Sequence, residues 1–158
     1  MSTIQTCLWF DNNGEDAVKF YKKLFKDVKV GETMRWGKNQ PGPEGQVLTM
    51  EFTLFGQPFL ILNGGPQFKF NEAVSIMINC KTQKEVDKYW NALTSDGGEE
   101  SMCGWCKDKF GLWWQIVPKG MTKMFTDKNK EKSGRAMQAM MKMRKLDINV
   151  IKKAFDGK

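Results

Sequence analysis

Hydrophobic and polar positions along the first part of the chain follow two repeated patterns. Short apolar runs at 4–10 and 74–80 predict β-strands, because they are rich in β-branched, aromatic and other apolar residues. Each run is followed by apolar positions spaced three and four apart, which predicts a helix that covers a sheet with one face. Matched residues of these two helices stand 69 positions apart: Asp16 and Glu85, Ala17 and Val86, Phe20 and Tyr89, Tyr21 and Trp90, Leu24 and Leu93.

A second internal match indicates two hairpins that turn at glycine. The sequence Phe55-Gly56-x-x-Phe59-x-Ile61-Leu62 aligns with Phe110-Gly111-x-x-Trp114-x-Ile116-Val117 at an offset of 55 residues. Extended runs precede both hairpins, at 47–54 and 103–109, and a further strand is expected at 28–36.

Glycine and proline separate these predicted elements. They indicate a loop at 39–45 and a link between the two halves at 63–71. We therefore expect an α+β fold of two βαβββ half-repeats, at about 1–66 and 70–119, within one domain that spans 1–119.

Beyond Pro118 the pattern becomes helical, and the charge changes with it. Asp127 and Asp147 are expected to cap helices that run to about Met143 and Phe155. Twelve of the 25 Lys and Arg residues but four of the 18 Asp and Glu residues lie in 119–158, so this segment carries +8 and the rest −1. We expect 120–158 to be a basic helical tail that packs on the domain.

The methionine-rich part of this tail leaves an alternative open. An amphipathic helix with Met137, Met140, Met141 and Met143 beside lysines and arginines could bind a partner instead of its own domain. The only aromatic residues from 119 onward are Phe125 and Phe155, so a stacking platform for nucleic acid is not expected.

Composition places the chain among cytoplasmic globular proteins. Charged residues interrupt every apolar run before membrane-spanning length, so no membrane association is expected. The first ten residues lack the basic start and apolar core of a secretion signal. The four cysteines, Cys7, Cys80, Cys103 and Cys106, suit a reducing compartment as free thiols.

Several sequence motifs are similar to those of one superfamily. The repeated strand, helix and strands, with Phe20-Tyr21 near the end of the first helix, resemble the glyoxalase/bleomycin-resistance/extradiol-dioxygenase (vicinal oxygen chelate) superfamily. The motifs that resemble its PhnB-like branch, whose members are often labelled 3-demethylubiquinone-9 3-methyltransferase, are Leu8-Trp9-Phe10, Ala17-Val18-Lys19-Phe20-Tyr21, Asn71-Glu72-Ala73-Val74-Ser75, Glu85-Val86-Asp87-Lys88-Tyr89-Trp90, Cys103-Gly104-Trp105, Trp114-Gln115-Ile116-Val117-Pro118 and Met137-Gln138-Ala139-Met140.

The resemblance implies a homodimer and a cleft lined by the concave faces of the sheets. Metal-binding relatives take ligands from the first and last strands of each half, and the two internal offsets place these positions at Thr6, Leu60, Ser75 and Gln115. None of them is a good ligand for zinc or iron, and the chain contains no histidine. We therefore expect no metal and no cofactor.

Strand alternation then assigns the neighbours of these four residues in the cleft. Residues two apart on a strand share a face, and pairing about each glycine turn sets Glu51 opposite Leu60 and Cys106 opposite Gln115. The predicted ligand-binding cleft consists of Thr6, Leu8, Phe10, Glu51, Leu60, Ser75, Met77, Asn79, Cys106, Trp113 and Gln115, with Val117 beside it. This apolar lining with a few polar groups is typical of a small-molecule site, although the same residues could be core or strand residues.

Two further patterns suggest other chemistry. Cys103-Gly104-Trp105-Cys106 has the spacing of redox and zinc motifs, but residues three apart on a strand point to opposite faces. A lone reactive Cys106 remains a hypothesis. The methyltransferase label would require a glycine-rich turn after the first strand, where Asp11, Asn12, Asn13 and Gly14 provide a single glycine.

These observations favour a metal-independent protein that binds a small organic molecule. The alternative is an enzyme, either the methyltransferase of the family label or another lyase or transferase that acts in the same cleft. Glu51 and Cys106 are then the candidate reactive groups. The sequence names neither the ligand nor a reaction, and the cleft could form within one chain or across a dimer.

Overall fold

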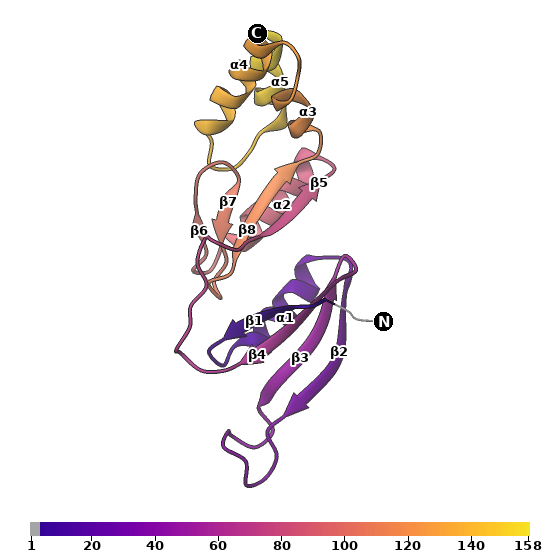
Figure 1. Cartoon of the computed structure of the whole chain (residues 1–158), viewed down its shortest axis with the longest axis vertical. Helices are drawn as coiled ribbons and strands as arrows, with labels where there is room; N and C mark the ends of the chain where they lie inside the picture. The colour runs from indigo at the N-terminus through magenta and orange to yellow at the C-terminus, as the bar shows by residue number, and fades with distance from the viewer. Residues whose placement is uncertain (1–3) are drawn as a thin grey trace. The chain divides into compact units, whose positions relative to one another are not determined.

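The computed structural model describes residues 4–158, and the chain divides into two compact units with the boundary in the sequence between Phe70 and Asn71 (Figure 1). The first unit contains β1 (Thr6–Phe10), α1 (Gly14–Leu24), β2 (Val28–Arg35), β3 (Val47–Leu54) and β4 (Gln57–Asn63). The second unit contains β5 (Ile76–Cys80), α2 (Gln83–Leu93), β6 (Glu99–Glu100), β7 (Trp105–Lys107) and β8 (Trp113–Pro118). It continues with α3 (Met121–Phe125), α4 (Lys130–Met141) and α5 (Ile148–Asp156).

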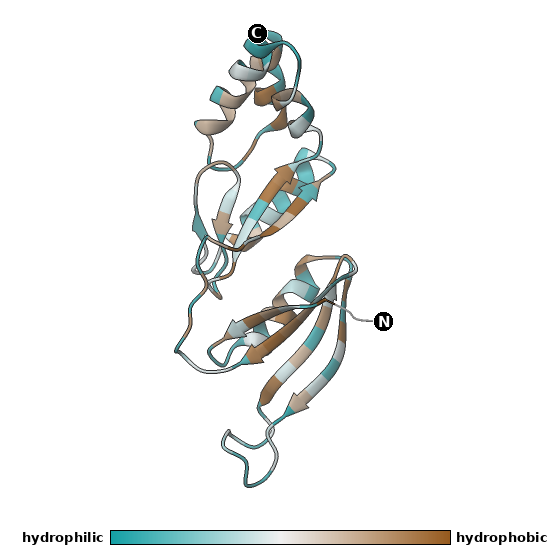
Figure 2. Ribbon diagram, in the orientation of Figure 1, coloured by the Kyte–Doolittle hydropathy of each residue, from teal (hydrophilic) through white to brown (hydrophobic). Residues whose placement is uncertain are grey.

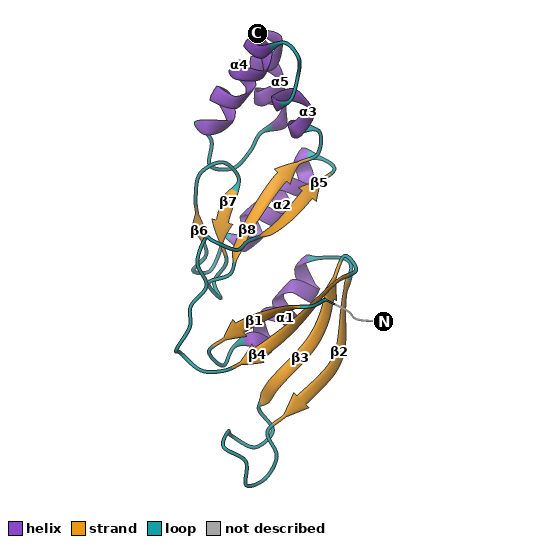
Figure 3. Cartoon of the chain, in the orientation of Figure 1, coloured by secondary structure: helices purple, strands orange, loops and turns teal. Residues whose placement is uncertain are grey.

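The two units share one topology. The sheet of the first unit has the strand order β1-β4-β3-β2, and that of the second has β5-β8-β7-β6. In the first unit β1 runs parallel to its neighbour β4, and in the second unit β5 runs parallel to its neighbour β8. The other neighbouring strands are antiparallel. The predicted α+β fold of two βαβββ modules with C-terminal helices is therefore confirmed (Figure 3).

Each helix covers one face of its own sheet. In the first unit the ring of Tyr21 on α1 lies 6.3 Å from that of Phe52, which is stacked 5.1 Å from Phe59. Alternation along β3 and its neighbours puts the buried residues on this face, and Figure 2 shows the resulting bands of hydrophobic and hydrophilic residues along β2 and β3. The apolar core therefore lies between sheet and helix.

The start of α1 is capped from the sheet. Asn63, at the end of β4, accepts a hydrogen bond from the Gly14 backbone N–H at 3.0 Å. Its side-chain amide donates to the carbonyl of Val47 at 2.9 Å. A Cβ atom at Gly14 would collide with Ile61, so glycine lets the helix start approach β4 closely.

The second unit buries two indole rings with their N–H groups satisfied. Trp90 on α2 donates to a carboxylate oxygen of Glu100 at 3.0 Å, and Trp114 on β8 donates to Asp108 at 2.8 Å. Asp108 also accepts backbone N–H groups of Phe110 and Leu112. This buried carboxylate therefore organises the turn between β7 and β8.

Both predicted glycine turns are confirmed as turns between strands, but they differ in length. Phe55 and Gly56 have φ angles of 49° and 80° and form a two-residue turn between the paired residues Leu54 and Gln57. In the second unit the Asp108 N–H donates to the carbonyl of Leu112, which leaves three residues, 109–111, in the turn.

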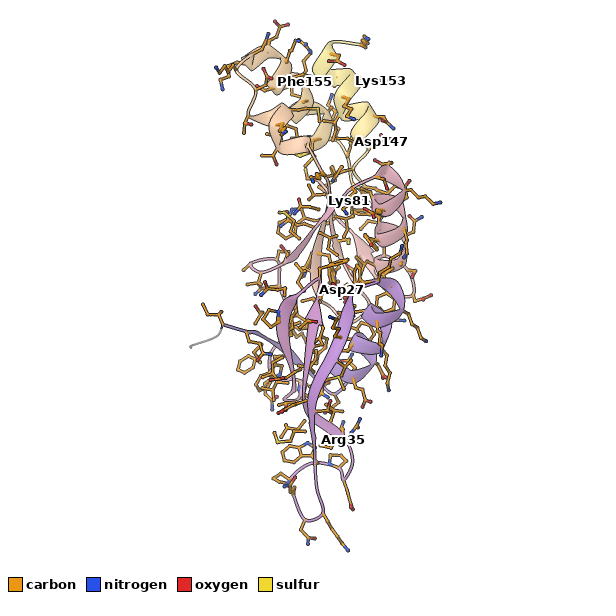
Figure 4. All side chains as sticks on the ribbon, turned by 90° about the vertical axis from the view of Figure 1, so that its right-hand side faces the viewer. Asp27, Arg35, Lys81, Asp147, Lys153 and Phe155 are labelled. Carbon is orange, nitrogen blue, oxygen red and sulfur yellow. The ribbon has the colours of Figure 1, made fainter. Side chains whose placement is uncertain are left out.

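The C-terminal helices form their own small core within the second unit. Val117, Met121, Ala136, Leu146 and Ile151 are buried together. Asp147 caps α5, as predicted, by accepting from the N–H groups at 149 and 150, and Figure 4 shows it at the start of that helix. The expected cap at Asp127 is wrong, because Asn129 caps α4. Among residues 4–158, no helix is long and apolar enough to cross a bilayer.

Candidate functional site on the open sheet faces

Each four-stranded sheet has a second face that its own helix leaves uncovered, here called the open face. In the first unit, cross-strand pairing sets Cys7 opposite Leu60 and Leu60 opposite Glu51. These three side chains form a row across the open face, because directly paired residues point to the same side of a sheet. The predicted pairing of Glu51 with Leu60 is confirmed.

A β-bulge extends this row onto β2. The register shifts between Val30 and Thr33, so two residues of β2 oppose the single residue Glu51. A Cβ atom built on Gly31 would lie 3.3 Å from the carboxylate oxygen Oε2 of Glu51. The glycine therefore leaves room for the half-buried carboxylate to lie over the edge of the sheet.

An aromatic pair borders the same face at the end of β1. Trp9 is paired with Leu62, and its indole N–H donates to the carbonyl of Gly65 at 2.8 Å. The ring of Phe68 meets that of Trp9 edge to face at 4.9 Å. Gly64 packs directly against the indole ring, where any side chain would collide with it.

In the second unit the equivalent row consists of Met77, Gln115 and Trp105. Met77 pairs with Gln115 across the parallel strands, and Trp105 pairs with Gln115 across the hairpin. The Gln115 amide donates to the hydroxyl of Ser75 at 2.9 Å, which orients the side chain. Its carbonyl oxygen can accept a hydrogen bond from a ligand on the open face.

Trp113 and Lys107 adjoin this row. They are paired across the β7–β8 hairpin, and the Lys107 ammonium lies 5.8 Å from the centre of the Trp113 ring. Glu99 on β6 forms an ion pair of 2.8 Å with the same ammonium. The open face of the second unit thus presents two half-exposed indoles, an oriented amide and a fixed charge pair.

The prediction that Thr6, Leu8 and Phe10 share a face with Leu60 is wrong. Leu8 is paired with Ile61, whose side chain lies on the helix side, and both Leu8 and Phe10 are buried in the core. Thr6 lies on the same side, because it is two residues from Leu8. The connection from strand to helix has three residues in the first unit and two in the second, so the offset of 69 does not hold for the strands.

The predicted position of Cys106 is also wrong. It pairs with Trp114 on the helix side of the sheet, and Trp105 takes the place opposite Gln115. Burial, with the nearby carboxylates of Asp108 and Glu100, raises the pKa of the Cys106 thiol to about 12. A neutral, buried thiol is a poor nucleophile, so the hypothesis of a reactive Cys106 loses its physical basis.

The remaining predicted residues lie on open faces, in two groups. Glu51 and Leu60 belong to the first unit, and Ser75, Met77, Asn79, Trp113 and Gln115 belong to the second. Sequence reasoning missed Cys7, Trp9 and Trp105. Cys7 and Trp9 are found when the alignment of β1 with β5 is shifted by one residue. Trp105 is found when the turn between β7 and β8 is given three residues in place of two.

The donor atoms in these rows do not suit a transition-metal ion. One row offers a thiol, a leucine and a carboxylate, and the other offers a thioether, an amide and an indole. Zinc and manganese sites use several imidazole, thiolate or carboxylate ligands. Within residues 4–158, no group of three or more Cys, Asp or Glu side chains is placed to hold an ion.

Comparisons with known proteins agree with this architecture. A PhnB protein from Bacillus cereus is 32% identical, with a TM-score of 0.68 over 74% of this chain and 99% of its own. The protein PA1353 from Pseudomonas aeruginosa is 19% identical, with a TM-score of 0.61 over 75% and 98% of the two chains. The fosfomycin resistance protein FosX from Listeria monocytogenes, in a complex with Mn(II) and sulfate, is 14% identical, with a TM-score of 0.52 over 73% and 89%.

No curated protein matches the chain. The sequence profile of one family, described as 3-demethylubiquinone-9 3-methyltransferase, matches residues 2–117 and therefore both βαβββ modules. The chain belongs to this PhnB-like family and has the glyoxalase-like fold that FosX shares.

Proposed function

We propose that the protein binds a small organic molecule with an aromatic or apolar part on its open sheet faces, without a metal ion. The observation that carries this proposal is the group around Gln115, where Trp105, Trp113 and Met77 adjoin an amide held by Ser75. Indoles give large apolar contact and stack on flat rings, and a fixed amide selects for hydrogen-bonding groups.

Exposure of these side chains supports the same function. Met77 is 51% exposed on its strand, and both indoles are partly exposed. Apolar surface of this kind is costly to leave in water and marks places where a ligand binds. The Gln115 carbonyl would accept a hydrogen bond from a ligand N–H or O–H group.

An enzyme is the second candidate, and Glu51 favours it. In the described part of its unit, the Glu51 carboxylate has neither a hydrogen bond nor an ion pair and lies on the open face beside the β-bulge. Such a group could take a proton from a bound molecule. The methyltransferase activity of the family description has less support, because the turn from β1 to α1 lacks the glycine-rich loop of a nucleotide-binding fold.

A thermal-shift screen of small metabolites would test the proposal. The library would include S-adenosylmethionine and ubiquinone analogues, because a ligand that binds the folded state raises its stability by mass action. A hit should bind untagged, dialysed protein equally well with and without a chelator. Binding should be lost in Gln115→Ala and kept in Gln138→Ala, a control on the exposed side of α4.

Two results would contradict the proposal or decide between its two forms, a binding protein and an enzyme. A library without any ligand that depends on Gln115 would contradict it. Loss of turnover but not of binding in Glu51→Gln would establish the enzyme.

Light scattering of the same untagged protein would test the homodimer that we propose from the family resemblance.

A further inference from the structure

The loop that leads into β7 has an unusual backbone. Cys103 and Gly104 have φ angles of 58° and 84°, so two consecutive residues are in the left-handed region just before Trp105. Cys103 carries a side chain, which makes this conformation costly unless other contacts hold it. The position of Trp105 depends on what fixes this loop.

The C-terminal tail supplies those contacts. The Cys103 N–H donates to the carbonyl of Met143 at 2.7 Å, and the Gly104 N–H donates to the carbonyl of Arg144 at 2.8 Å. The Gly104 carbonyl in turn accepts from the N–H of Ile116 on β8 at 2.8 Å. In Figure 1 the loop between β6 and β7 reaches the segment that joins α4 to α5.

Leu146 also fixes the loop before β7, through packing against Gly104. Its side chain is fully buried, and a Cβ atom added at Gly104 would lie 2.8 Å from its Cδ1 atom. Gly104 therefore provides the space that Leu146 fills. The tail and the loop are complementary at this point, because a side chain at position 104 would displace Leu146.

Gln83 ties this segment to α2 with both ends of its amide. It donates to the carbonyl of Leu146 at 2.9 Å and accepts from the N–H of Ile148 at 3.0 Å. An ion pair of 2.9 Å between Lys145 and Asp87 lies beside it. The tail segment is thus held between α2 and the loop before β7.

We propose that the segment 143–148, here called the brace, positions Trp105 on the open face and so sets the affinity of that face for its ligand. This inference rests on the proposed function. The brace lies beyond residue 117, where the family match ends, so it is a feature added to the shared modules. Leu146 and Gln83 are positioning residues, because they act on Trp105 through the loop.

Fluorine NMR of fluorotryptophan-labelled protein would test the brace without any ligand. Trp105→Phe assigns the Trp105 signal, and Trp9→Phe assigns a reference signal in the first unit. We expect Leu146→Ala and Gln83→Ala to shift or broaden the Trp105 signal and to leave the Trp9 signal unchanged. Leu146→Met should restore the wild-type Trp105 signal, and the exposed control Val150→Ala should not change it.

An unchanged Trp105 signal in Leu146→Ala, in Gln83→Ala and in the double variant would overturn the proposal. If Leu146→Ala fails to fold, Gln83→Ala decides, because it removes both hydrogen bonds to the brace, together with one to Asp87, and leaves the apolar core intact. The test separates the two hypotheses. A moved Trp105 signal with no ligand found would support the brace and contradict the proposed function.

Discussion

Cys7 lies directly opposite Leu60 in the parallel pairing of β1 with β4, and Met77 has the same place opposite Gln115. The two modules are therefore related by 70 residues in their first strands but by 69 in their helices. One residue fewer between strand and helix accounts for the difference. Because a shift of one residue reverses every side chain of a strand, Cys7 and Trp9 face the open side and Leu8 faces the core.

This register predicts a clear order of thiol reactivity. Cys7 is exposed, Cys103 is partly buried, and Cys80 and Cys106 are buried. A maleimide added at neutral pH to native protein should modify Cys7 fastest and leave Cys80 and Cys106 unmodified. Peptide mass spectrometry at several times would measure the order. Modification of Cys106 as fast as Cys7 in folded protein would contradict the assigned register of β7.

Repetition made the modules predictable from the sequence. The helices of both units and the two glycine turns follow from patterns that recur at fixed offsets, and each pattern has a physical cause in face alternation or in positive φ. The cap at Asp147 was predictable for a similar reason, since an aspartate before an apolar helical pattern satisfies free N–H groups.

The faces of β1 and β7 were not predictable in the same way. Both depend on single-residue differences in connections, which an ungapped repeat comparison does not detect. The role of Asn63 was hidden for a different reason. Its hydrogen bonds join residues 49 and 16 positions away, so no local pattern marks it as the cap of α1.

The buried side chain of Asn63 should contribute strongly to the stability of the first unit. Asn63→Ala leaves the Gly14 N–H and the Val47 carbonyl without their partner in a buried place, which should lower the free energy of unfolding by about 1–3 kcal/mol. Urea unfolding would measure this. The control Asn12→Ala, at an exposed position of the same unit, should change stability by less than about 0.5 kcal/mol. Equal effects would argue against the buried cap.

Two helix glycines should respond to alanine with opposite signs. A Cβ atom at Gly14 would overlap Ile61, so Gly14→Ala should destabilise the protein by about 1–3 kcal/mol. A Cβ atom at Gly134 in α4 would meet open space, so Gly134→Ala should stabilise by up to about 1 kcal/mol through helix propensity. Thermal or urea unfolding of the two variants provides the comparison, and a stabilising Gly14→Ala would contradict the close approach of α1 to β4.

The buried cysteines should weaken the fold at high pH. Burial raises the pKa of Cys80 and of Cys106 to about 12, whereas an unfolded thiol ionises near pH 8.5. Between these values the unfolded chain releases protons that the folded chain retains, so the free energy of unfolding falls as the pH rises toward 12. Their contribution to stability is complete below the pKa of the unfolded thiol.

Urea unfolding at about pH 8 and about pH 10.5 would measure this loss of unfolding free energy. Between these two pH values the thiols ionise in the unfolded chain but not in the folded one. Cys80→Ala and Cys106→Ala each remove one ionising group, so each variant should lose less stability between the two pH values than the parent protein, and the double variant should lose least. The comparison uses the change with pH, so the constant cost of a cavity cancels, and ionisation of tyrosine and lysine is common to all variants. An equal loss in all four proteins would mean that Cys80 and Cys106 are not buried as protonated thiols.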